Sequence, residues 1–156
     1  MQTSTNANID VAAVASSEAS RSDCLKAILR MTSLRPTRQR LYLADRMIGR
    51  DRHVTAEALY AEACAAGEEI SLATVYNTLR QFQSSGLVRE LAREGTRSVF
   101  DTNTSAHHHF YLVDDQRVID IPSSSVRISG LPEIMPGYEL DDIQVLVRIR
   151  RKENPA

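Results

Sequence analysis

The chain has 156 residues, of which 42% are hydrophobic, and a formal net charge of −1. This length fits one average domain or two small ones. No apolar run approaches the roughly 18 residues that a membrane span needs, which predicts a soluble, globular protein without a membrane partner. The N-terminus lacks a basic start and a continuous apolar core. It therefore does not resemble a secretory signal, and we expect a cytoplasmic protein.

Residues 1–20 are rich in serine, alanine and asparagine, and we expect them to form a disordered N-terminal tail. The chain has two cysteines, Cys24 and Cys64, which lie far apart and form no CxxC motif. In a cytoplasmic protein both are expected to be reduced thiols.

Charge is distributed unevenly along the sequence. Residues 21–97 carry 13 Lys and Arg against 9 Asp and Glu, whereas residues 98–156 carry 6 against 9. The asymmetry indicates a first half that contacts a polyanion and a second half with another task. Solvated helix faces can show a similar excess of basic residues, so the charge distribution alone does not establish binding to a polyanion.

Apolar spacing and capping residues predict four helices in the first half. The first is expected after Ser22 and the second after Thr37, with Gly49 at its end. The third is expected after Thr55 and the fourth after Ser71.

The periodicity then changes to that of strands. Residues 87–91 and 97–101 predict two short strands joined by a turn at Gly95. Helices followed by a hairpin are typical of a winged helix-turn-helix. We therefore predict an α+β fold, with a winged-helix DNA-binding domain over 21–101 and a small α/β dimerisation and ligand-sensing domain over 102–156.

The fourth predicted helix has the composition of a DNA-recognition helix. Its expected buried stripe is Leu72, Val75, Leu79 and Phe82. No acidic residue occurs in 71–85, whereas a merely solvated helix would more usually carry Glu and Lys. The other face carries side chains of the types that contact bases or phosphates: Ser71, Thr74, Tyr76, Asn77, Arg80 and Gln81.

Basic residues also surround the start of the second helix. Arg35, Arg38 and Arg40 lie around Pro36, where they would suit a phosphate or a narrow minor groove. A solvated basic turn is the alternative. The same two interpretations apply to the arginines of the hairpin, which are Arg89, Arg93 and Arg97.

The second half predicts a small sheet. Residues 110–115 and 117–121 form an expected hairpin, and the alternating pattern of 143–149 predicts a third strand. The segment between is loop-rich, and any helix there should be short. Three strands cannot bury both of their faces alone, which predicts a homodimer.

Three of the four histidines are consecutive: His107, His108 and His109. In an extended strand His107 and His109 would share one face, with His108 on the other. Such a run could bind a metal ion, ligate haem or lie solvated in a loop.

The motifs LRPTRQRLYL, HVTAEALYAE, EISLATVYNTLRQFQSSGLV, SVFD and HHH, in this order, resemble the ferric uptake regulator family over roughly residues 25–121. The resemblance implies a dimeric transcription factor that binds double-stranded DNA, with metal at the hinge between its two domains. It implies that Tyr76 acts on the recognition helix and that Arg35 enters the minor groove. Asn77 stands where many relatives have arginine, so a different operator preference is expected.

The resemblance also implies metal ligands. His53, Asp101, His109 and Asp120 match positions that supply ligands in the family, and together they suit Fe²⁺, Mn²⁺ or Zn²⁺. The structural zinc site of many relatives needs a CxxC after the histidine run, and LVDDQR replaces it here. That site is therefore absent from this sequence.

Further ligand positions of the family are lost at Phe110, Tyr111 and Arg127. This pattern resembles the iron response regulator branch of alphaproteobacteria, which implies haem bound through His107, His108 and His109. The Cys-Pro haem motif of some members is missing, because Leu25 follows Cys24.

The sequence thus predicts an iron- or haem-responsive regulator, mainly a repressor, in which haem or metal between the domains changes DNA affinity. One alternative is a repressor of the same family that is activated by divalent metal. A distant alternative is a small metal-dependent hydrolase, against which no HExxH motif or paired nucleophile appears.

Overall fold

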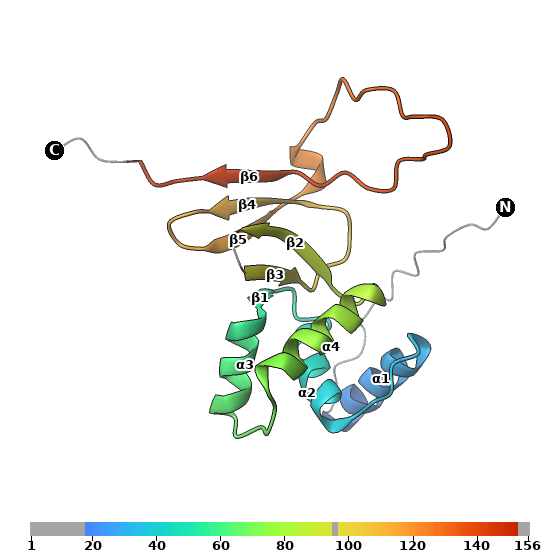
Figure 1. Ribbon diagram of the computed structural model, residues 1–156, viewed down its shortest axis with the longest axis vertical. Helices are drawn as coiled ribbons and strands as arrows, with labels where there is room; N and C mark the ends of the chain where they lie inside the picture. The colour runs from blue at the N-terminus through green and yellow to red at the C-terminus, as the bar shows by residue number, and fades with distance from the viewer. Residues whose placement is uncertain (1–17, 95–96, 153–156) are drawn as a thin grey trace. The chain divides into compact units, whose positions relative to one another are not determined.

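The computed structural model describes residues 18–94 and 97–152, and the chain divides into two compact units after Thr104. The first unit contains four helices and a three-stranded sheet (Figure 1). Its helices are α1 (Glu18–Met31), α2 (Arg38–Met47), α3 (Ala56–Ala65) and α4 (Leu72–Ser84). Its strands are β1 (His53–Thr55), β2 (Arg89–Glu94) and β3 (Arg97–Asp101).

Hydroxyl side chains start three of these helices, as their sequences predict. Thr37 Oγ1 accepts a hydrogen bond from the backbone N–H of Arg40, and Thr55 Oγ1 accepts one from Ala58. Ser71 Oγ accepts one from Thr74. Each bond satisfies a backbone donor that the first turn of a helix leaves without a partner.

The first helix differs from the expectation. It begins at Glu18, so Ser22 lies inside α1 and is not its N-cap. Of the tail expected over 1–20, residues 1–17 lie outside the described residues and 18–20 belong to α1. The extra turn brings Arg21 to α2, where it pairs with Asp45 and donates to the carbonyl oxygen of Ile48. This contact between helices explains a start that local sequence does not signal.

The core of the first unit gathers one apolar face from each helix. On α4 the predicted stripe is confirmed: Val75, Leu79 and Phe82 are fully buried, and Leu72 packs against them half-buried. Burial of an aromatic side chain removes a large apolar area from water, so Phe82 contributes strongly to the packing of α4 against the core. The opposite face of α4 therefore points away from the core.

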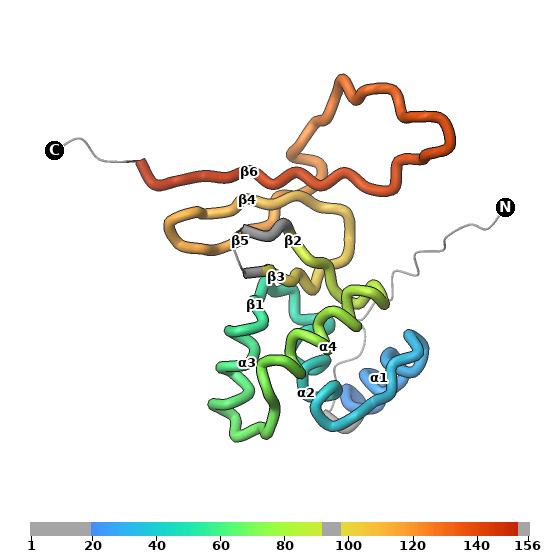
Figure 2. Tube along the Cα trace, in the orientation of Figure 1, coloured from blue at the N-terminus to red at the C-terminus, as the bar shows by residue number. Residues whose placement is uncertain are grey.

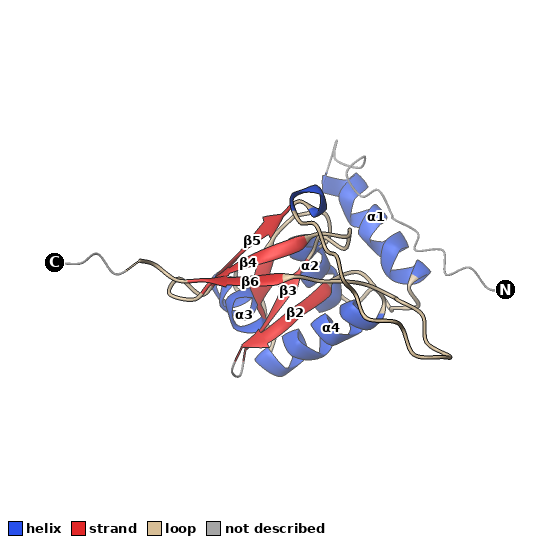
Figure 3. Cartoon of the chain, turned by 90° about the horizontal axis from the view of Figure 1, so that it is seen from above, coloured by secondary structure: helices blue, strands red, loops and turns tan. Residues whose placement is uncertain are grey.

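The sheet of the first unit has the order β1–β3–β2, with both pairs antiparallel. The predicted hairpin is confirmed by β2 and β3, although its turn at Gly95 lies outside the described residues. The short strand β1 was not predicted. It places His53 opposite Asp101 in the register of the sheet. Figure 3 colours these strands red and the helices that pack with them blue.

The second unit contains strands β4 (His108–Leu112), β5 (Arg117–Ile121) and β6 (Leu146–Ile149), and a short 3-10 helix η2 (Ser123–Ser125). The sheet has the order β5–β4–β6. The predicted hairpin is confirmed by the antiparallel pair β4–β5, whereas β6 pairs parallel to β4. A parallel partner needs a long connection, which the segment between η2 and β6 supplies (Figure 2).

The third strand is shorter than its alternating sequence predicts. Ile143 and Val145 precede β6, which starts at Leu146, and Val147 and Ile149 remain exposed. The connecting segment contributes several further exposed apolar side chains: Ile128, Leu131, Ile134, Met135, Tyr138 and Leu140.

Four helices together with two small sheets confirm the predicted α+β fold, although the described residues of the second unit form only strands and the 3-10 helix η2. Among the described residues, no helix has the length and apolar character needed to cross a membrane.

Candidate metal and nucleic-acid sites

The second unit brings together two histidines and one aspartate. Nε2 of His107 lies 3.4 Å from Oδ1 of Asp120, and Nε2 of His109 lies 3.5 Å from the same oxygen. The two imidazole rings are nearly edge to face, with centroids 4.5 Å apart. The ligand atoms of the three residues lie within 4.8 Å of one another.

Strand geometry produces this cluster. His109 is opposite Asp120 in the β4–β5 register, so their side chains share one face of the sheet. His107 lies two positions before His109 and projects to the same side. The alternation that the sequence predicts for the histidine run is therefore confirmed at these two positions.

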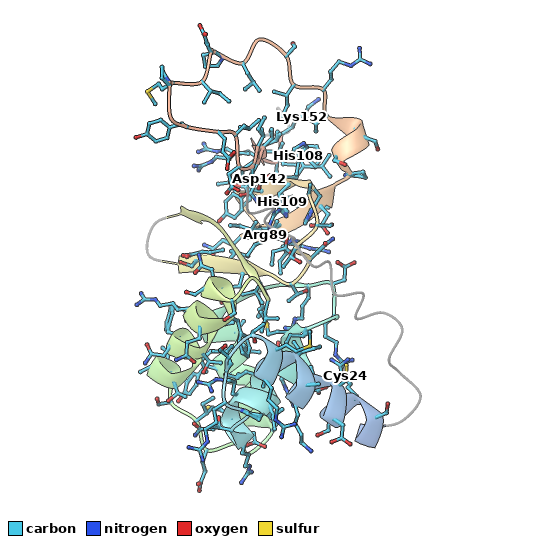
Figure 4. All side chains as sticks on the ribbon, turned by 90° about the vertical axis from the view of Figure 1, so that its right-hand side faces the viewer. Cys24, Arg89, His108, His109, Asp142 and Lys152 are labelled. Carbon is cyan, nitrogen blue, oxygen red and sulfur yellow. The ribbon has the colours of Figure 1, made fainter. Side chains whose placement is uncertain are left out.

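The histidine between them has a different environment. The ring of His108 turns to the other side of the strand, and its Nδ1 accepts a hydrogen bond from the backbone N–H of Val145 at 3.3 Å. Figure 4 labels His108 and His109 in the second unit. The three consecutive histidines thus do not form one ligand group, and His108 stands apart from Asp120.

A backbone contact selects the tautomer of His107. Its Nδ1 lies 2.8 Å from the carbonyl oxygen of Ser105, which is a hydrogen-bond acceptor only. In the neutral imidazole Nδ1 therefore carries the proton, which leaves the lone pair of Nε2 available to a metal ion. Metal-binding histidines commonly have this arrangement, in which a carbonyl orients the ring from behind.

The first unit pairs the other two predicted ligands. Nε2 of His53 lies 3.7 Å from Oδ1 of Asp101, across the β1–β3 pair. Asp101 is fully buried, and its Oδ1 accepts a hydrogen bond from the backbone N–H of Asn103 at 2.8 Å. The predicted set of four ligands is thus found as one pair in each unit, and His107 is an additional member beside His109 and Asp120.

The chemistry of the second-unit cluster fits a divalent transition metal. Two neutral imidazoles and one carboxylate are a donor set that Zn²⁺, Mn²⁺ and Fe²⁺ accept. The sequence associated His107 with haem alone. Its position two residues before His109, on the same side of the chain, brings it near Asp120 and makes it a metal-ligand candidate as well.

The predicted DNA-contacting residues of α4 differ in their exposure and in their contacts with neighbouring side chains. Asn77, Arg80 and Gln81 are exposed on the face away from the core. Ser71 and Thr74 contact each other, with their hydroxyl oxygens 2.9 Å apart. Ser71 therefore has a structural role as the helix cap, whatever else it contacts.

The Tyr76 and Arg38 side chains each contact a neighbour in the first unit, whereas Arg35 is exposed. The Tyr76 hydroxyl donates to Glu57 Oε1 at 2.5 Å, which links α4 to α3. Arg35 is exposed before α2. Nη2 of Arg38 lies 3.2 Å from Glu68 Oε2, yet its side chain is 82% exposed and this surface pair is weak. Arg38 is thus able to exchange this partner for a phosphate.

The wing is described only in part. Arg89 lies at the start of β2 and is half-buried. The side chains of Arg93 and Arg97 lie outside the described residues.

Comparison with known proteins identifies the family. The model of the Ferric uptake regulator family matches residues 31–147. The ferric uptake regulation protein of Pseudomonas aeruginosa is 33% identical over 129 residues, which cover 80% of this chain and 96% of the relative. That of Escherichia coli K12 is 40% identical over 102 residues, covering 64% of this chain and 68% of the relative.

Solved structures agree. The ferric uptake regulator of Pseudomonas aeruginosa with manganese is 30% identical, with a TM-score of 0.63, and the match covers 82% of this chain and 98% of that one. The Vibrio cholerae ferric uptake regulator has the same TM-score at 26% identity, covering 81% and 98%. Members of the family are metal-responsive transcription regulators and not enzymes, which overrules the hydrolase alternative. The chain belongs to the ferric uptake regulator family.

Proposed function

We propose that this chain is a cytoplasmic, dimeric repressor that binds double-stranded operator DNA and responds to a divalent metal ion. The observation that carries the proposal is the His107–His109–Asp120 cluster in a chain whose other unit has a winged-helix order of elements. Regulators of this family bind DNA and are usually dimers.

DNA would be contacted by the outer face of α4. Asn77 and Arg80 are exposed there, and residues 71–85 carry no acid that would repel phosphate. Asparagine and arginine are among the side chains that read adenine and guanine in the major groove. Arg35, exposed before α2, would enter the adjacent minor groove, and Tyr76 would contribute a ring oriented by Glu57.

Metal would be held by Nε2 of His107, Nε2 of His109 and a carboxylate oxygen of Asp120. An ion bound by these three groups would supply positive charge between the two imidazoles and the carboxylate. The backbone contact between His107 and Ser105 then orders the chain directly after Thr104, where the second unit begins. Ordering this junction is how the cluster would influence DNA binding by the first unit.

His53 and Asp101 stay predicted ligands on the strength of the family resemblance. They contact each other within the first unit, and metal binding by a His53→Ala variant tests whether this unit supplies a ligand.

The dimer would form on the apolar face of the second sheet. Phe110 of β4 is opposite Ile119 of β5 and opposite Val147 of β6, so the three side chains form one row. Ile119 is 41% exposed and Val147 is 36% exposed, although both are apolar strand residues. A second copy that covers this row would bury surface that the single chain leaves in water.

The test is DNA binding with and without Mn²⁺. A duplex selected from a random pool by the wild-type chain serves as the operator. Replacing Tyr76 and Arg80 by alanine should lower affinity for this duplex at least about tenfold, since contacts to bases and phosphates are removed. If neither replacement changes affinity for the duplex, α4 is not the recognition helix and the proposal is wrong.

Haem is a second candidate ligand. The run of three histidines presents imidazoles on both faces of the chain at the start of β4, because His108 is turned away from His107 and His109. Imidazole is a good axial ligand for haem iron. Under this proposal the chain would be functionally similar to the iron response regulator branch.

An absorption titration with haem distinguishes the two ligands. A haem sensor gives a saturating Soret band at one equivalent, and this band is lost when His107, His108 and His109 are all replaced by alanine. A titration without saturation, or one that is the same in the variant, removes haem from the proposal.

A further inference from the structure

One arginine connects the segment before α2 to the recognition helix. Arg40, half-buried in the first turn of α2, donates from Nη1 to the carbonyl oxygen of Arg35. From Nη2 it donates to Oε1 of Gln81 at 2.5 Å. Gln81 lies on the exposed side of α4, so the two acceptors belong to the two elements of the first unit that we propose contact DNA.

Neighbouring residues of the same turn connect α2 to the loop that leads into α4. Nη2 of Arg38 pairs with Glu68 at 3.2 Å, and Nε2 of Gln39 donates to the carbonyl oxygen of Glu69 at 2.7 Å. These contacts anchor the start of α2. Among the three residues, Arg40 alone contacts both the Arg35 backbone and α4 itself.

The chemistry of this bridge requires a guanidinium group. Both acceptors are uncharged oxygens, one from a peptide and one from an amide. The planar fork of arginine points separate N–H groups in fixed directions, so it can hold two acceptors in a set geometry. The ammonium group of lysine is a single point and cannot reproduce this geometry.

We propose that Arg40 is a positioning residue that holds the Arg35 segment at a fixed place relative to α4. Arg35 could then contact the minor groove while α4 contacts the major groove of the same duplex, and the segment would not first have to become ordered. This inference rests on the proposed function, because it presupposes that Arg35 and α4 contact DNA. Its energetic basis is preorganisation: a segment that is already ordered loses less conformational entropy on binding.

The experiment measures affinity for the selected duplex at several salt concentrations, with wild type, Arg35→Ala, Arg40→Met and the double variant. Arg40→Met should lower affinity about tenfold, and the loss caused by Arg35→Ala should shrink from about tenfold to less than about threefold in the Arg40→Met background. The salt dependence of duplex affinity should be the same in Arg40→Met as in the wild type. Arg40→Lys, which keeps the charge, should show the same reduced coupling.

Three results would overturn the inference. The first is wild-type affinity in Arg40→Met. The second is a slope of log affinity against log salt that falls by about 0.9 in Arg40→Met with an undiminished Arg35→Ala effect, which indicates a direct phosphate contact. The third is full restoration of the coupling in Arg40→Lys. Thermal unfolding checks that each variant folds, and Arg40→Lys carries the test if Arg40→Met does not. Arg127→Met, which removes an exposed charge from the second unit, is the matched control.

Failure of the proposed function has a different signature. If Arg35→Ala and Tyr76→Ala both leave wild-type affinity unchanged, these residues do not contact DNA, whatever the result at Arg40.

Discussion

His109 and Asp120 face each other across the β4–β5 pair, with Nε2 of the histidine 3.5 Å from Oδ1 of the aspartate. His107 approaches the same oxygen at 3.4 Å, and His108 does not take part. The alternating pair of the histidine run therefore lies beside an acid from the next strand, and these three residues are the group that we propose binds metal.

Replacing Asp120 by asparagine should weaken Mn²⁺ and Zn²⁺ binding at least about tenfold. The carboxylate is the charged donor of the cluster, and an amide oxygen compensates poorly for a lost charge. Isothermal titration calorimetry measures the change. His108→Ala is the control and should bind metal within about twofold of wild type. Equal losses in the two variants would mean that the cluster is not the binding site.

His53→Ala tests whether the first unit supplies a ligand. Under the family resemblance this replacement should also weaken metal binding about tenfold, because one imidazole is removed. The same titration provides the measurement. Unchanged affinity would restrict the ligands to the second unit and contradict the resemblance at this position.

Ser71→Ala should destabilise the first unit by about 1 kcal/mol, since it removes the oxygen that accepts the Thr74 N–H. Ser71→Asp should restore the stability, because aspartate is an equally good cap. Denaturant unfolding followed by circular dichroism gives both values. If Ser71→Asp folds like wild type but binds DNA more weakly, the residue also lies near phosphate, as the sequence predicts.

Much of the first unit could be predicted because its signals are local. Thr37, Thr55 and Ser71 each cap a helix within three residues of themselves, and the stripe ending at Phe82 follows from helical spacing. The strand β1 was missed because its three residues pair with β3, nearly fifty positions later. The early start of α1 was missed for the same reason, since its support comes from the contact between Arg21 and Asp45 on α2.

The site was predictable to a similar extent. Alternation along the histidine run placed His107 and His109 on one face, and the resemblance supplied Asp120. The register that brings Asp120 opposite His109 depends on pairing between strands, which the chain alone does not specify. The parallel pairing of β6 to β4 is likewise a long-range contact, and only its strand character was visible.

Val147→Asp should prevent dimer formation. Val147 lies in the exposed apolar row with Phe110 and Ile119, and a buried carboxylate in an apolar interface costs several kcal/mol. Analytical ultracentrifugation should show a dimer for wild type and a monomer for the variant. Ser124→Asp, at an exposed position of η2, is the control and should stay dimeric. A dimeric Val147→Asp protein would place the interface on another surface.

The most direct test of the central claim compares operator binding with and without Mn²⁺ in the wild type and in a His107→Ala/His109→Ala variant. The wild-type chain should bind the selected duplex at least about tenfold more tightly with Mn²⁺, a typical size for coupling between two sites. The variant should keep its metal-free affinity and lose the increase. A response to Mn²⁺ that is equal in the two proteins, or absent from the wild type, would contradict regulation through this cluster.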